Sequence, residues 1–209
     1  MMSFDMGGGT VDILPVVNGL MPEAEKVRSA YGKYEAYGAS MGIEGLEAIR
    51  MREQMGMGGM EVSELDIVYS KRMSEFGEVV APSPAFCEIV DLCAKDGRQV
   101  IPLDMSDYEY DTTYIECVSA IEFTAEHRLA KKGVKRRFAA TTPEDLAREW
   151  DRMVSRVRGY RELSRRREKH IAKEIAETMR FRGTLLAIVE VERADGVAAL
   201  LEEEYGALQ

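Results

Sequence analysis

The segment 183–196 constrains the fold more than any other part of the chain. Gly183 opens it, the nearly continuous apolar run 184–191 (TLLAIVEV) fills it, and acidic residues appear where the run ends. A strand that is apolar on both faces is typical of the middle of a parallel sheet with helices on each side. Because such sheets gather ligands outside the carboxyl ends of their strands, the acids of this segment are the first candidate site residues.

The rest of the chain alternates between strand and helix patterns. Pro15 lies within the first predicted strand and suggests an edge position or a bulge, because proline removes one ladder donor. The Gly-rich stretch 55–60 predicts a mobile loop. We expect strands at 11–17, 34–40, 99–104 and 184–191, and helices at 22–30, 43–55, 63–76, 84–95, 108–132, 143–158, 162–180 and 193–204.

This alternation predicts one α/β domain over residues 1–209, with a mainly parallel sheet flanked by helices. A large helical insertion at 106–180 precedes the last strand. A length of 209 residues is enough for such a domain to bury a sizeable core without disulfides.

Composition indicates a cytoplasmic protein. The three cysteines, Cys87, Cys93 and Cys117, are odd in number and fit no zinc spacing, so we expect them to be reduced core residues. The sequence contains no apolar run of 18 residues, so we expect no membrane span. The N-terminal residues lack the basic segment and apolar core of a secretion signal.

Charge is unevenly distributed along the chain. The net charge is −9, yet residues 126–182 contain 18 Lys and Arg against 9 Asp and Glu. Such asymmetry can mark a nucleic-acid surface, or helices that dock on an acidic body, either their own or that of a second subunit. We favour a homo-oligomer that docks through the basic insertion over a nucleic-acid partner, because acids interleave with the bases and no recognition motif is present. An arginine row marks either a solvated face or an anion-binding or subunit-docking surface: Arg148, Arg152, Arg156, Arg161 and Arg165.

The N-terminal residues 4–12 (FDMGGGTVD) resemble the second phosphate loop of the actin/Hsp70 ATPase superfamily. That superfamily also requires an earlier phosphate loop, a later adenosine loop and a much longer chain, none of which the sequence contains. We therefore expect residues 1–10 to form a flexible Gly-rich tail.

Two longer segments carry a second resemblance. Residues 92–104 (LCAKDGRQVIPLD) describe a helix that ends at glycine and a strand that ends in aspartate, and residues 166–191 describe a long helix that leads into the central strand. Together with Gly196 and Val197, and more loosely with residues 11–27, they resemble the TraB/PrgY-like family.

The chain departs from this family at two histidine motifs. The family has Gly-Thr-x-His after its first strand and Gly-x-x-His after its last, whereas this sequence has NGLM at 18–21 and EVER at 190–193. If the family is a lineage of metal-dependent hydrolases, the resemblance implies a member that has lost its nitrogen ligands.

A site without histidine can still be built at the strand ends, from Glu190, Glu192, Asp104, Glu23 and Asn18. Oxygen ligands of this kind suit a divalent cation. Glu190 and Glu192 are two residues apart, so on a strand they share one face and need counter-charge. The alternative is that these acids lie in solvent or pair with arginines.

Three functions follow from these observations. The first is a non-catalytic or degenerate TraB-like protein that acts by binding or self-association. The second is a divalent-metal-dependent hydrolase with a carboxylate site at the strand ends. The third is binding of nucleic acid or another anion by the arginine-rich helices.

Overall fold

The computed structural model describes residues 1–32, 34–55 and 63–206, and five strands within them form one sheet in the order β1-β2-β5-β3-β4. β1 runs antiparallel to β2, and all other neighbours run parallel. The predicted α/β class with a mainly parallel sheet is therefore confirmed. The strands are β1 (Met2–Met6), β2 (Gly9–Val16), β3 (Ala36–Ala39), β4 (Ile101–Pro102) and β5 (Thr184–Glu190).

β5 lies between β2 and β3, and its residues 185–189 are all buried, as a central strand requires. Its neighbour β2 accommodates Pro15 without a bulge. The backbone N–H of Thr10 donates to the carbonyl of Gly183, so the alternation along β2 points the nitrogen of Pro15 away from β5. On that other side β1 reaches only as far as Ile13, so the proline removes no ladder bond.

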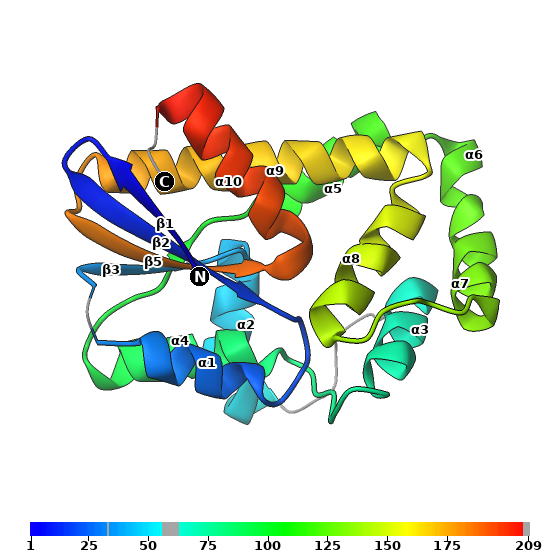
Figure 1. The fold of residues 1–209 in the computed structure, drawn as a ribbon, viewed down its shortest axis with the longest axis horizontal. Helices are drawn as coiled ribbons and strands as arrows, with labels where there is room; N and C mark the ends of the chain where they lie inside the picture. Colours follow the sequence, from blue (N-terminus) through cyan, green and yellow to red (C-terminus); the bar gives the residue numbers. More distant parts are fainter. Residues whose placement is uncertain (33, 56–62, 207–209) are drawn as a thin grey trace.

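Helices cover both faces of the sheet (Figure 1). Ile171 of α9 and Val197 of α10 join the buried core on one face. Leu46 of α2 and Phe86 of α4 join the core on the other face, together with α1. The helices of these layers are α9 (Arg158–Met179) and α10 (Val191–Tyr205) on one side, and α1 (Glu23–Ala30), α2 (Ile43–Met55) and α4 (Pro84–Lys95) on the other.

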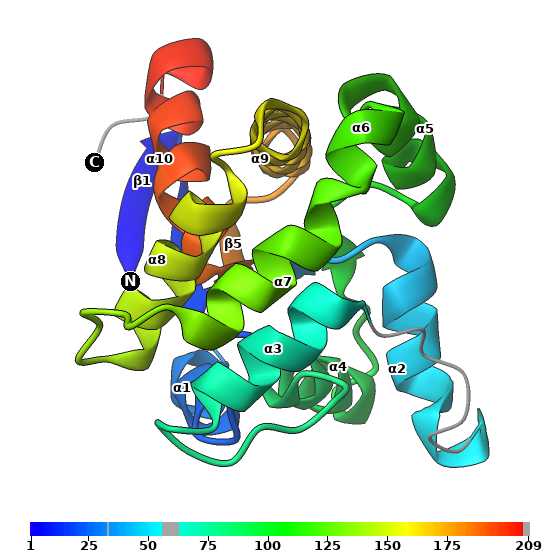
Figure 2. The same ribbon diagram turned by 90° about the vertical axis from the view of Figure 1, so that its right-hand side faces the viewer.

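A third group of helices lies beyond the carboxyl ends of the strands, at the right of Figure 1. Three of them form what we call the cap, in which α3 packs against α7 and α8 (Figure 2). Met73 and Leu146 of the cap share one buried cluster with Val17 and Val191 at the strand ends, so the cap covers this edge of the sheet. The cap consists of α3 (Glu64–Met73), α7 (Ala125–Lys135) and α8 (Pro143–Val154).

The predicted insertion corresponds to the helices α5 to α9 between β4 and β5. Its last helix, α9, belongs to the core of the sheet. The long helical region predicted at 108–132 is divided into three helices, α5, α6 and α7. Ser119 and Glu122 form a capping box that starts a new helix after α5. The two helices that precede α7 are α5 (Asp107–Cys117) and α6 (Ala120–Phe123).

Gly159 falls between the helices predicted at 143–158 and 162–180. In the structure it does not separate two helices but lies in the first turn of α9. A Cβ atom on this residue would lie 2.7 Å from the carbonyl oxygen of Cys117. Its N–H donates to Glu122 at 2.9 Å. The glycine therefore permits the start of α9 to approach the end of α5 closely.

The flexible tail predicted at 1–10 is wrong, because these residues form a β-hairpin. Phe4 and Met6 alternate with exposed positions and enter the core. Gly7 and Gly8 form the two-residue connection between β1 and β2, with φ values of 58° and 95°. Two-residue hairpin turns require such positive φ values, so the glycines serve the turn.

Most of the mobile loop predicted at 55–60 lies outside the described residues. The helices predicted at 22–30, 43–55 and 84–95 are confirmed within one residue. Over the ranges that the structure describes, no helix combines the length and the apolar character needed to cross a membrane.

Candidate functional site

The carboxyl ends of the parallel strands bring together residues that are far apart in the sequence. Asn18 follows β2, Ser40 follows β3 and Glu190 ends β5. The amide of Asn18 donates to Glu190 Oε1 at 3.3 Å, and the backbone N–H of Glu190 donates to the Ser40 hydroxyl at 3.1 Å. Three strand ends are thus joined by side-chain hydrogen bonds, and two of the candidate residues, Asn18 and Glu190, are in direct contact.

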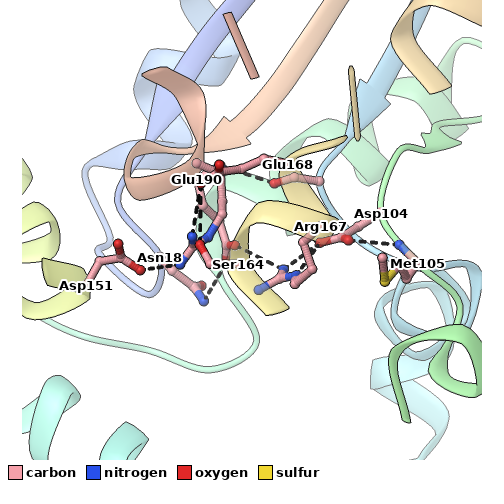
Figure 3. A network of polar contacts seen from close by, with 10 residues as sticks. Asn18, Asp104, Met105, Asp151, Ser164, Arg167, Glu168 and Glu190 are labelled. Carbon is pink, nitrogen blue, oxygen red and sulfur yellow. Dashed lines mark hydrogen bonds and ion pairs between the residues drawn. The ribbon is translucent and has the colours of Figure 1, made fainter. Parts of the chain in front are cut away.

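Arg167 of α9 connects this group to the end of β4. Its Nε atom lies 3.0 Å from Asp104 Oδ2, and its terminal nitrogen lies 3.4 Å from Glu190 Oε2 (Figure 3). The other carboxylate oxygen of Asp104 accepts the N–H of Met105 at 2.8 Å. Asp104 is therefore neutralised by an arginine, which is the alternative that the sequence left open for these acids.

A second buried arginine joins the cap to the layer formed by α9 and α10. Arg193, in the first turn of α10, lies 3.2 Å from Glu168 of α9 and forms an ion pair with Asp151 of α8. Figure 3 shows Asp151 and Glu168 on opposite sides of this network. Arg193 is 8% exposed, so its charge depends on these two carboxylates for stabilisation.

Glu192 differs from its predicted position. β5 ends at Glu190, so Glu192 lies in the first turn of α10 and does not share a strand face with it. Within the described residues, three buried side-chain atoms have no hydrogen-bond partner: Glu192 Oε2, Tyr69 Oη and Arg193 Nε. All three lie at the edge between cap and sheet, where unpaired polar atoms are costly unless a ligand uses them.

The ionisation of this group reflects its burial. Burial, followed by the negative charge of Glu190, raises the pKa of Glu192 to about 7, against the opposing charge of Arg193. Burial also raises the pKa of Glu190, although Arg167 and Arg193 act in the opposite direction. Burial and then the charges of Glu192 and Glu190 raise the pKa of Tyr69. The Tyr69 hydroxyl on α3 therefore lies in the field of both acids.

Glu23 lies at the same edge with its own partners. Its carboxylate accepts the N–H of Val17 at 3.2 Å and lies 2.7 Å from Lys26, which also pairs with Glu144 at 2.9 Å. Glu23 contributes to the field that raises the pKa of Tyr69. It is thus a neighbour of the acid pair and is neutralised separately.

The edge contains more negative than positive groups. Its ion pairs and its unpartnered carboxyl group bring together seven acids and three cations among the described residues. The acids are Asp104, Glu190, Glu192, Asp151, Glu168, Glu23 and Glu144, and the cations are Arg167, Arg193 and Lys26. A buried excess of carboxyl groups is met either by retained protons or by a further cation.

The predicted acids do not form a metal-binding group. In the described ranges no three His, Cys, Asp or Glu side chains are arranged to hold a metal ion. Asp104 and Glu23 point to Arg167 and Lys26, so their oxygens do not converge with those of Glu192. A divalent cation would also require the hard-oxygen shell of six or more ligands that Mg²⁺ and Ca²⁺ prefer.

Within the predicted arginine row, Arg148, Arg152 and Arg156 have the four-residue spacing of one helix face, but they do not share a helix. α8 ends at Val154, so Arg156 falls in the connection and the later members belong to α9. Arg148 pairs with Asp195 at 3.3 Å, and Arg161 donates to the carbonyl of Ser155 at 3.4 Å. The remaining members, Arg152, Arg156 and Arg165, are exposed, which agrees with a solvated surface.

Sequence reasoning missed Arg167 and Tyr69 as site residues. Arg167 was one of three consecutive arginines, but it completes the inward series at four-residue spacing that includes Leu163, Ile171 and Ile175. This periodicity is the signal that could have found it. No local pattern places Tyr69 over the sheet edge, because its position depends on how the cap packs.

Comparison with protein-family models, with curated proteins and with solved structures found no match. The resemblance to TraB/PrgY-like proteins therefore stays a prediction. Function has to be inferred from the geometry of the edge itself.

Proposed function

We propose that this protein binds a small organic cation between the cap and the carboxyl edge of the sheet. One observation carries this proposal: the buried edge has an excess of carboxyl groups, and the unpartnered atoms of Glu192 and Tyr69 belong to its two opposing sides. A cationic ligand would supply both the missing charge and the missing hydrogen bonds. Ligands of parallel α/β sheets collect at this same edge.

The chemistry of the edge favours an ammonium or guanidinium group over a metal ion. Glu192 Oε2 is a free acceptor for an N–H donor, whereas the described acids form no metal-ligand set. The ring of Tyr69 lies 5.7 Å from that of Trp150, and the Tyr69 hydroxyl lies in the field of Glu190 and Glu192, so aromatic side chains of the cap are near these acids. Aromatic faces next to carboxylates are suited to organic cations, since ring quadrupoles attract positive charge.

Binding is expected to release a proton. At neutral pH the Glu192 carboxyl, whose pKa is raised to about 7, is only partly ionised. A cation binds the ionised form, so it competes with the proton. The affinity for a ligand of constant charge should therefore be roughly tenfold higher at pH 8 than at pH 6, because the ionised fraction of a group with this pKa changes by about that factor.

Access to the edge requires the cap to separate from the sheet. Tyr69 Oη and Glu192 Oε2 are buried atoms, and Met73 and Leu146 close the cluster beside them. A ligand can reach both atoms only when α3 and α8 move away from the strand ends. We therefore expect the association rate constant of the ligand to lie below the diffusion limit.

This proposal agrees with the first of the functions predicted from the sequence, in which the protein acts by binding. The metal-dependent hydrolase lacks a ligand group among the described residues. Self-association through the insertion is not tested by the structure of a single chain and stays a prediction.

Isothermal titration calorimetry with ethanolamine, agmatine and putrescine at pH 8 tests the proposal. We expect saturable binding of at least one of these probes, weakened about tenfold at pH 6 and lost in the Glu192→Gln variant. The matched control is Glu203→Gln, an exposed acid on the same helix, which should bind as the wild type does. Absence of saturable binding by all three probes, or equal affinity in both variants, would overturn the proposal.

A further inference from the structure

The outer side of the cap contains a cleft of opposite charge. It has a volume of about 450 Å³ and lies between the end of α3, the end of α7 and the start of α8. Its polar wall contains four cationic side chains and a single acid, Glu75. The cations are Arg72, Lys135, Arg136 and Arg137.

The chain concentrates three of these cations at one turn. α7 ends at Lys135, and Arg136 adopts an extended backbone conformation that redirects the chain. Arg72 of α3 holds this turn in place: its guanidinium donates to the carbonyls of Gly133, at 3.3 Å, and of Arg136, at 3.1 Å. The cleft is thus fixed by contacts within the cap and does not require a ligand to form.

Only part of this positive charge is already used. Arg72 pairs with Glu75 at 3.0 Å, and Arg136 lies 4.0 Å from Glu149. Lys135 and Arg137 are exposed and have no ion-pair partner among the residues that the structure describes. The cleft therefore has two uncompensated positive charges.

The floor of the cleft is apolar and aromatic. Phe76, Phe138 and Leu146 line it, and the Arg136 guanidinium lies 5.2 Å from the centre of the Phe138 ring. Phe138 in turn lies 6.0 Å from Trp150, the only tryptophan of the chain. A ligand on this floor would contact Phe138, whose ring lies next to Trp150, so the fluorescence of Trp150 can report binding.

We propose that this cleft binds an organic phosphate monoester with an aromatic or apolar substituent. A phosphate monoester has a charge of roughly −1.5 to −2 at neutral pH, which matches the two free cations. Arginine and lysine are common partners of phosphate oxygens. The substituent lies on Phe76 and Phe138, where it removes apolar surface from water. This site is separate from the acidic edge, because none of the residues that line the cleft belongs to the ion pairs or the unpartnered groups of the edge.

Titrations monitored by Trp150 fluorescence test this site, with phenyl phosphate, inorganic phosphate and benzoate as probes. We expect saturable binding of phenyl phosphate, with affinity at least tenfold above that of the other two probes. The double variant Lys135→Ala/Arg137→Ala should reduce this affinity at least tenfold. The control Lys131→Ala/Lys132→Ala removes the same charge from exposed positions of α7 outside the cleft and should change it less than twofold.

The proposal is overturned by three results. The first is a failure of phenyl phosphate to bind. The second is an equal loss of affinity in the two double variants, which would show attraction to net charge alone. The third is an affinity for one of the other probes equal to that for phenyl phosphate. Equal affinity for inorganic phosphate would show that the aromatic floor does not contribute to binding, and equal affinity for benzoate would show that the phosphate group does not.

Discussion

The acidic edge and the basic cleft are linked by three aromatic rings in contact: Tyr69 belongs to the edge, Phe138 lines the cleft, and Trp150 packs against both. The charges of the two regions behave differently. At the edge, burial prevents charges from remaining free, so acids pair with Arg167 or Arg193 or retain a proton, as Glu192 does. In the cleft, exposed Lys135 and Arg137 have no ion-pair partner in the part of the chain that the structure describes. The unpartnered buried groups of the edge therefore reduce the stability of the fold, whereas the exposed charges of the cleft do not.

The largest effect should come from the residue that the two regions share. Trp150→Ala removes a buried ring that contacts both Tyr69 and Phe138, and we expect a loss of about 4 kcal/mol in the free energy of unfolding. Chemical denaturation measures this value. Trp150→Phe keeps an aromatic ring at this position and should lose much less stability. Equal losses of stability in the two variants would contradict a role for the ring.

Removal of the buried counter-charge should come next. Arg167→Ala leaves Asp104 and Glu190 buried without their guanidinium, which should destabilise the protein by about 3 kcal/mol. The neighbouring Arg166 pairs with Glu116 and Glu162 on the exposed side of α9 and provides the control. In urea denaturation Arg166→Ala should be close to wild type. If the two variants unfold alike, the comparison between buried and exposed charges fails.

Glu192→Gln should stabilise the protein, in contrast to the first two variants. The folded-state pKa of Glu192 is raised to about 7, so the native state holds more protons than the unfolded state between the ordinary carboxyl pKa and pH 7. Stability is therefore lost as the pH rises through this window. We expect Glu192→Gln to gain about 1 to 2 kcal/mol at pH 8 and little at pH 5, as measured by thermal unfolding. A gain that does not depend on pH would refute the assignment.

The smallest effect should be that of the cleft cations. Lys135→Ala/Arg137→Ala should change the free energy of unfolding by less than about 0.5 kcal/mol, because exposed charges contribute little. Thermal unfolding in a buffer without phosphate measures this. A large loss of stability would mean that these side chains support the turn after α7. The charges of the cleft would then stabilise the fold, as the buried ion pairs of the edge do.

The sequence predicted most of the fold because several signals are local. An apolar run without alternation identified β5. Ser63 and Thr142 mark helix starts by their residue type, and each accepts the N–H three residues later. The N-terminal hairpin was missed because its glycines were read as flexibility. The alternation of Phe4 and Met6 before a two-glycine turn was the available signal.

The candidate site was predicted in part. Asn18, Asp104 and Glu190 meet because each follows or ends a parallel strand, and such ends share one edge of the sheet. Glu192 was misplaced because β5 passes directly into α10 and no side chain caps that helix start. The position of Tyr69 depends on the packing of the cap, which involves contacts between distant parts of the chain that no local pattern encodes.

The pairing of β2 with β5 has a consequence for synthesis of the chain. Thr10 pairs with Thr184, so the inner neighbour of β2 is translated only after nearly all the other elements. During this time the apolar edge of the N-terminal hairpin is available to other nascent chains, and such edges promote aggregation. The yield of soluble protein from a cell should therefore depend more on elongation rate and chaperone supply than on the stability of the finished fold.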